Sequence, residues 1–168
     1  MTARRVARPL VLLACIAVCA PACTPDVDLK QALELTETSA GWYDAGIKDG
    51  KNKIVPSVTF RLRKTPDADI DQVSVNVVFR HPPPPGAADE EEWGEVFIQA
   101  ADFTEGQQTP PLTARTENGY TGDPPQSRTD LFKNSQFRDV RAHVYVKYGS
   151  TQWVDIGTID VPRQLITR

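Results

Sequence analysis

Reactive side chains are scarce in this chain of 168 residues. All three cysteines lie within the first 23 residues, and the two histidines are His81 and His143. From Thr24 onward there is no thiol for a disulfide or a cysteine-based zinc site, and neither histidine has a partner at the spacing of metal ligands. We therefore predict no cofactor, no metal site, and a domain held together by its hydrophobic core alone.

Catalytic motifs are missing as well. The chain has neither the Gly-x-Ser-x-Gly nor the Ser-x-x-Lys pattern of serine nucleophiles. The acidic run 67–71 is followed by Gln72 and Val78, at positions where a calcium loop has Gly and Glu. No catalytic residue is predicted from these patterns. A secreted carbohydrate-active or other hydrolase with a carboxylate-based site, which needs two convergent acids, stays open as the alternative.

Basic residues are fewer than acidic ones in this chain. The whole chain has 19 basic and 22 acidic residues. Removal of residues 1–22 would take away Arg4, Arg5 and Arg8 and no acid, which leaves 16 against 22, or a net charge of −6. Nucleic acids and anionic lipid surfaces both require a basic face on their partner. The charge balance therefore argues against both kinds of partner.

The one long apolar run lies at the N-terminus. A basic segment with Arg4 and Arg5 precedes the apolar stretch 10–20, and small residues follow at 20–22. This order of basic, apolar and small residues is typical of a secretory signal peptide, and the apolar run is too short for a membrane span. We predict a cleaved helical signal segment over residues 1–22. The pair of arginines lacks the hydrophobic residues that follow it in a twin-arginine signal, which favours ordinary Sec export.

The residues Ala20-Pro21-Ala22-Cys23 resemble the lipobox of bacterial lipoproteins. The resemblance implies that Cys23 is diacylated on sulphur, that residues 23–30 form a tether, and that the membrane is a partner through the lipid anchor. In Gram-negative members of that family the residue after the cysteine directs sorting, and Thr24 implies the outer membrane facing the periplasm. The alternative is a soluble secreted protein that is cut after Ala22 and keeps a spare thiol.

The remaining chain alternates between apolar and polar residues with a period of two, which is typical of half-buried strands. Val58, Phe60 and Leu62 share one face of such a strand, and Val75 and Phe79 share a face of the next. The predicted strands are 33–47, two within 54–80 on either side of a 65–69 turn, 93–100, 112–116, 137–148 and 152–161. In the fourth strand we expect Trp93 or Val96, Phe97 and Ile98 to supply the core.

Seven strands joined by short turns predict an all-β fold over residues 31–168. An antiparallel, seven-stranded immunoglobulin-like or fibronectin type III-like sandwich fits this spacing, and a closed barrel is the alternative. The strand, polar turn, strand and Phe arrangement from Val58 to Phe79 is similar to that of FxLYD-type domains in uncharacterised bacterial lipoproteins. That resemblance implies a single sandwich domain and brings no catalytic residues.

Residues 117–136 form the one long segment without strand periodicity. It carries Tyr120 beside flexible glycines, together with Arg128 and Phe132. Binding residues often lie on loops of rigid scaffolds, so these three are the candidate binding residues. The alternative is that the segment covers an open end of the sandwich, with Tyr120 and Phe132 as its plugs.

The expected function follows from the predicted cellular location and fold. We expect a membrane-anchored protein of the cell envelope that acts as a non-catalytic binding or scaffold module. Its partner would be a protein or an envelope polymer, bound through the end loops or through an exposed strand edge. The proline run 82–85 is expected to be a stiff loop, the acidic run 90–92 a solvated face, and His143 a surface residue.

Overall fold

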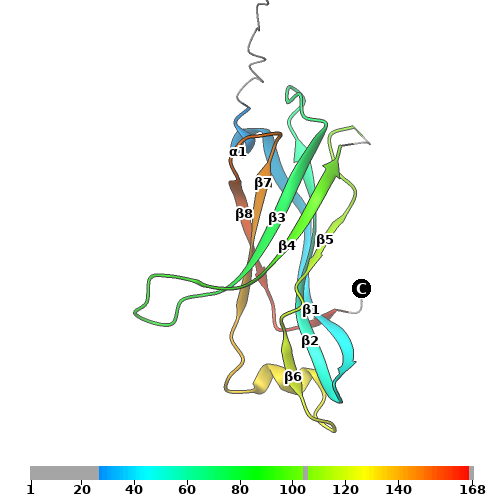
Figure 1. The fold of residues 1–168 in the computed structure, drawn as a ribbon, viewed down its shortest axis with the longest axis vertical. Coiled ribbons are helices and arrows are strands. Elements are labelled where there is room, and N and C mark those ends of the chain that lie inside the picture. Colours follow the sequence, from blue (N-terminus) through cyan, green and yellow to red (C-terminus); the bar gives the residue numbers. More distant parts are fainter. Residues whose placement is uncertain (1–26, 104–105, 167–168) are drawn as a thin grey trace, which may run out of the picture.

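Two β-sheets stacked face to face account for most of the structure (Figure 1). It is a computed structural model that describes residues 27–103 and 106–166. The elements are α1 (Leu29–Ala32), β1 (Leu33–Lys48), β2 (Lys51–Lys64), β3 (Gln72–His81), β4 (Glu91–Asp102), β5 (Leu112–Arg115), β6 (Tyr120–Gly122), the 3₁₀ helix η1 (Arg128–Lys133), β7 (Val140–Lys147), β8 (Val154–Val161) and β9 (Leu165–Ile166). The predicted all-β sandwich is therefore confirmed.

The strands divide into a five-stranded and a four-stranded sheet. Sheet A has the order β5-β2-β1-β9, with β6 also paired to β2, and sheet B has the order β4-β3-β7-β8. All seven predicted strands occur, and the described segments add two short ones, β6 and β9. Strands of two or three residues are too short to show a period, so the sequence pattern missed them. The expectation of a purely antiparallel fold is wrong at one place, because β9 pairs with β1 in parallel.

The hairpin between β1 and β2 follows directly from its turn residues. Asp49 and Gly50 have φ values of 51° and 78°. Positive φ at both central residues is the requirement of a type I′ turn, for which Asp-Gly is a favoured pair. The turn starts the pairing of Lys48 with Lys51, and an irregularity between Asp44 and Ile47 then shifts the register by one residue, so that Tyr43 lies opposite Val55 and Trp42 opposite Pro56. This register determines which side chains of β1 and β2 lie next to one another on the outer face of sheet A.

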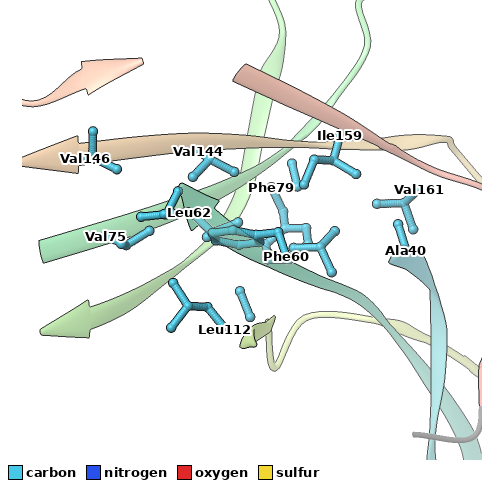
Figure 2. Packing of buried hydrophobic residues seen from close by; sticks show 14 of the residues in the cluster. Ala40, Phe60, Leu62, Val75, Phe79, Leu112, Val144, Val146, Ile159 and Val161 are labelled. Carbon is cyan, nitrogen blue, oxygen red and sulfur yellow. The ribbon is translucent and has the colours of Figure 1, made fainter. Parts of the chain in front are cut away.

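The core lies between the two sheets and is built by the predicted alternation. Figure 2 shows Phe60 and Leu62 of β2 among side chains of β3 and β7 such as Val75 and Val144. Val75 and Phe79 are both fully buried, as the two-residue period predicts. Leu29 of α1 is buried too, so the packed domain already includes the last residues assigned to the tether.

The expected core face of β4 is wrong in one respect. Phe97 is 56% exposed, and its ring packs at a tilt against that of Trp153, with 6.1 Å between the ring centres, on the outer face of sheet B. Val96 and Ile98, its neighbours along β4, pack against the core instead. Adjacent residues of a strand leave opposite faces of the sheet, so Phe97 and Ile98 cannot both point inward.

The two ends of the sandwich differ. The chain enters through α1 at one end, whereas β6, η1 and the β1–β2 hairpin lie at the other (Figure 1). The predicted signal peptide, Cys23 and Thr24 belong to residues 1–26 and lie outside the described residues. In the part that the structure describes, no helix is long and apolar enough to span a bilayer.

Candidate functional site

The segment 117–136 packs across the end of the sandwich opposite α1. Tyr120 begins β6, and its ring centre lies 5.6 Å from that of Trp42, which is fully buried. Phe132 of η1 approaches Trp42 at 6.1 Å, and Phe137 approaches it at 4.8 Å. Trp93 of β4 completes the group, at 6.1 Å from Trp42. We call these five residues the aromatic cap.

The three candidate binding residues of this segment do not converge on one site. Tyr120 and Phe132 are half-buried members of the aromatic cap, and the Tyr120 hydroxyl accepts a hydrogen bond from the backbone N–H of Arg138 at 2.9 Å. Arg128 instead points to β1 and pairs with the Asp44 carboxylate at 3.0 Å. These contacts favour the interpretation of the segment as an end plug, because its aromatic rings are already used in packing.

A hollow of about 440 Å³ lies on the outer face of sheet A, near the β1–β2 hairpin. We call it the Tyr43–Arg115 groove. Its lining comes from three adjacent strands and the segments that follow two of them. The lining residues are Tyr43, Ala45, Lys48, Asp49, Lys53, Val55, Arg115, Thr116 and Glu117.

Strand alternation places these side chains on the outer face. Trp42 and Ala114 point into the core, so their neighbours Tyr43 and Arg115 point outward. In the register of sheet A, Tyr43 lies opposite Val55 on β2, and Arg115 lies opposite Ser57 one position further along the same face. Tyr43 and Arg115 thus stand on either side of β2, on β1 and β5.

The Arg115 side chain lies across β2 and is held at two points. Its guanidinium carbon lies 3.6 Å from the centre of the Tyr43 ring, a close cation–π stack. Its Nε donates a hydrogen bond to the Ser57 hydroxyl at 3.2 Å. Ser57, which lies opposite Arg115 in the sheet, is fully buried. The guanidinium is thereby fixed while its two terminal nitrogens keep their donors.

The groove carries more positive than negative charge. Lys48, Lys53 and Arg115 face Asp49 and Glu117, which gives a surplus of one positive charge. Within residues 27–103 and 106–166, none of these three cations forms an ion pair. The chain as a whole has a net charge of −3. The groove therefore opposes the sign of the rest of the protein.

Other cations of sheet A are already neutralised. Arg61 pairs with Glu37 at 2.9 Å, and Lys51 lies 3.6 Å from the Asp123 carboxylate. These ion pairs are exposed and contribute little to stability. In each pair, however, the carboxylate already occupies the cation, which is then less available to an anionic ligand. The contrast makes Arg115 the cation of this face that is both rigid and open to an anion.

A second hollow, of about 570 Å³, lies beside the start of β7 and the end of β8. Two carboxylates, those of Asp139 and Asp160, line it. Asp139 pairs with Arg163 at 2.7 Å, and Asp160 pairs with Arg141 at 3.0 Å. A glycosidase needs one carboxyl as an acid and the other as a base or nucleophile. Two carboxylates that are each already paired with an arginine are poorly suited to these roles, because neither is free to contact a glycosidic bond.

His143 is not the fully exposed surface residue that its strand position predicts. Its side chain is 15% exposed, because the 82–90 segment brings Glu90 back over β7. The Glu90 carboxylate lies 2.7 Å from Nε2, and the Asp155 carboxylate lies 3.8 Å from Nδ1. Glu90 is likewise mostly covered, which corrects its assignment to a solvated face. Across the described chain, no group of three or more His, Cys, Asp or Glu side chains is placed to hold a metal ion.

Comparison of the chain with protein-family models, with curated proteins and with solved structures gives no match. Sequence patterns missed the groove because its residues are separated by up to about seventy positions and meet only through strand register. One available signal was the alternation that turns Lys53 and Val55 of β2 to the outer face, close to the Asp49-Gly50 turn.

Proposed function

We propose that this protein is a lipid-anchored component of the cell envelope whose sandwich domain is a non-catalytic binding module. The observation that carries the proposal is the Tyr43–Arg115 groove, where a cation is fixed by stacking and left without an acidic partner. A rigid sheet face of this kind supports recognition by pre-organised side chains, since little ordering is needed on binding.

The positions of the anchor and the groove at opposite ends of the domain support an anchored binding role. The signal pattern and the lipobox resemblance place the lipid on Cys23, a few residues before α1. The β1–β2 hairpin, beside which the groove opens, lies at the opposite end of the sandwich (Figure 1). An anchor at Cys23 would hold the α1 end near the bilayer and present the groove away from it. In a Gram-negative cell, Thr24 directs this arrangement to the outer membrane, facing the periplasm.

We further propose that the sandwich is immunoglobulin-like, of the fibronectin type III kind. Support comes from the strand order, in which β1, β2 and β5 are neighbours in one sheet and β4, β3, β7 and β8 are neighbours in the other. In such sandwiches, strands A, B and E lie in one sheet and strands C′, C, F and G lie in the other. Domains of this architecture bind through loops, edges and sheet faces, so the proposal agrees with a groove on sheet A.

The anchor is tested by Cys23→Ala in the full chain expressed with its own leader. We expect the variant to lose palmitate labelling and to move from the membrane to the soluble fraction, because the acylated sulphur is absent. Cys19→Ala is the matched control, since it removes a thiol from the same leader and should leave both readouts unchanged. Retention of label and membrane association by Cys23→Ala would overturn the lipid anchor at this position.

The hydrolase alternative finds less support in the geometry. The hollow that contains Asp139 and Asp160 would need to release both carboxylates from Arg163 and Arg141 before either could act on a glycosidic bond. The proposal of a binding module requires no such rearrangement. A release assay on reducing ends with acidic and neutral oligosaccharides tests the alternative directly, and turnover by the purified protein would overturn the non-catalytic assignment.

A further inference from the structure

We propose that the Tyr43–Arg115 groove binds an acidic glycan and holds a singly charged oxyanion of that glycan, a carboxylate or a phosphodiester, on Arg115. This inference deepens the proposed binding function by naming its ligand class, and its binding role rests on that proposal. It does not depend on the lipid anchor, because the groove is formed entirely by residues of sheet A and the segments beside it.

The geometry of Arg115 selects an oxyanion. Tyr43 covers one face of the guanidinium, and Ser57 takes the Nε donor. The two terminal nitrogens therefore remain as a planar fork, the arrangement that matches the two oxygens of a carboxylate or phosphodiester. Because the side chain is held at both points before binding, little rotamer entropy is lost when the anion arrives.

The charge of the groove selects a monoanion. Lys48, Lys53 and Arg115 exceed Asp49 and Glu117 by one positive charge, so one negative charge on the ligand balances the groove. A dianionic phosphomonoester would place a second charge beside the two acids. Those acids instead suit a ligand with hydroxyl groups, since a carboxylate accepts hydrogen bonds from hydroxyls. Sugars that carry one oxyanion per residue combine the two features.

The position of the groove on a sheet face disfavours an extended peptide. Peptides that bind to sheets add to a free edge and use main-chain hydrogen bonds. In the groove, β2 is paired with β1 from Ile54 to Ser57. On its other side the pairing with β6 ends at Ile54 and the pairing with β5 begins at Ser57, which leaves a gap of two residues that is too short for strand addition. Recognition on this face must therefore come from side chains, which favours a ligand that brings its own polar groups. Val55 lines the bottom of the groove and is only 4% exposed, so contacts to a ligand come from the polar and charged side chains around it.

The test uses the full chain, expressed with its leader and purified in detergent, and isothermal titration with three oligosaccharide probes. The probes are an oligogalacturonate, an oligosaccharide whose sugars are joined by phosphodiester bonds, and a neutral glucan of the same length. We expect one or both anionic probes to bind, with an affinity that falls as salt is raised, and the neutral glucan to bind at least tenfold more weakly. Whichever anionic probe binds more tightly identifies the source of the oxyanion.

Three variants assign the binding to the groove. Arg115→Ala is expected to weaken binding by roughly tenfold to a hundredfold, because a charge-assisted bidentate contact is lost. Arg115→Lys should not restore it, since lysine lacks both the fork and the flat stack on Tyr43. Lys53→Ala should weaken binding a few-fold. Arg61→Ala is the matched control: it removes an outward arginine of the same sheet that is already paired with Glu37, and should change the affinity less than about twofold.

Several outcomes would overturn the inference. Equal binding of the neutral glucan, no binding of either anionic probe, or wild-type affinity in a folded Arg115→Ala would each do so. A poly-glutamate peptide that binds more tightly than both anionic probes would overturn the choice of a glycan. Thermal unfolding of each variant shows whether it is folded, and Lys53→Ala retains the test if Arg115→Ala is not. The fractionation of Cys23→Ala fails or succeeds independently of all these results.

Discussion

The same substitution at two phenylalanines measures how much of the stability comes from the space between the sheets. Phe60 of β2 is fully buried between the two sheets, whereas Phe97 of β4 is 56% exposed on the outer face of sheet B. Phe60→Ala removes a buried ring and leaves a cavity, so we expect the free energy of unfolding to fall by about 4 kcal/mol. At Phe97 water fills the vacated space, and only the loss of partial burial remains, about 1 kcal/mol.

The comparison cancels the effects that the two sites share. Both residues lie inside strands, so the lower strand propensity of alanine applies equally to each variant. The expected difference of about 3 kcal/mol corresponds to roughly 10 °C in melting temperature for a domain of this size. Urea titration of each purified variant, monitored by tryptophan fluorescence and far-UV circular dichroism, gives both free energies of unfolding. The two curves are fitted with the same dependence of free energy on urea concentration. Equal losses at the two sites, or a loss below about 1.5 kcal/mol at Phe60, would refute the assignment of the core.

Three further predictions concern the end opposite α1 and its surroundings. Gly119→Ala should lower the free energy of unfolding by roughly 2 kcal/mol, because the added Cβ would overlap the carbonyl oxygen of Ile54; an unchanged urea midpoint would contradict this close packing. Tyr120→Phe removes the acceptor of the Arg138 N–H and should cost about 1 kcal/mol in the same assay while leaving glycan binding unchanged; a loss of binding would instead return the segment to a functional role. The hydrogen bond and charge of Arg138 hold the pKa of Glu91 below its ordinary value of 4.5. This pair therefore stabilises the fold above about pH 4.5 and loses its effect as pH falls through the depressed pKa, and carboxyl NMR titration should show Arg138→Gln raising that pKa; an unshifted midpoint would argue against the pair.

The aromatic cap and the groove make opposite use of aromatic rings. In the cap, Trp42, Tyr120 and Phe137 pack on one another and fill the end of the sandwich. In the groove, Tyr43 leaves one ring face to Arg115 and thereby fixes a cation at the surface. Trp42 and Tyr43 are neighbours in β1, so a single step along the strand separates a packing residue from a candidate binding residue.

The predicted strands were recoverable from the sequence because each depends on local alternation. The two-residue period placed Val75 and Phe79 inside, and the turn between β1 and β2 is formed by Asp49-Gly50, a pair that favours this hairpin locally. The same reasoning failed where elements were very short, as in β9, and where one face of β4 had to be chosen for Phe97. In these places the outcome depends on which neighbouring strand supplies the pairing, and this information is not local.

The sequence by itself determined the all-β class, the position of the main strands and the pattern that predicts export, because each of these is written in the order of neighbouring residues. Only the tertiary structure decided that the 117–136 segment covers an end of the sandwich and that Arg115 lies over Tyr43. The physical reason is strand register: residues about seventy positions apart come within 3.6 Å only because β1 and β5 both pair with β2. The sequence around Tyr43 and the sequence around Arg115 each contain no pattern that predicts this contact.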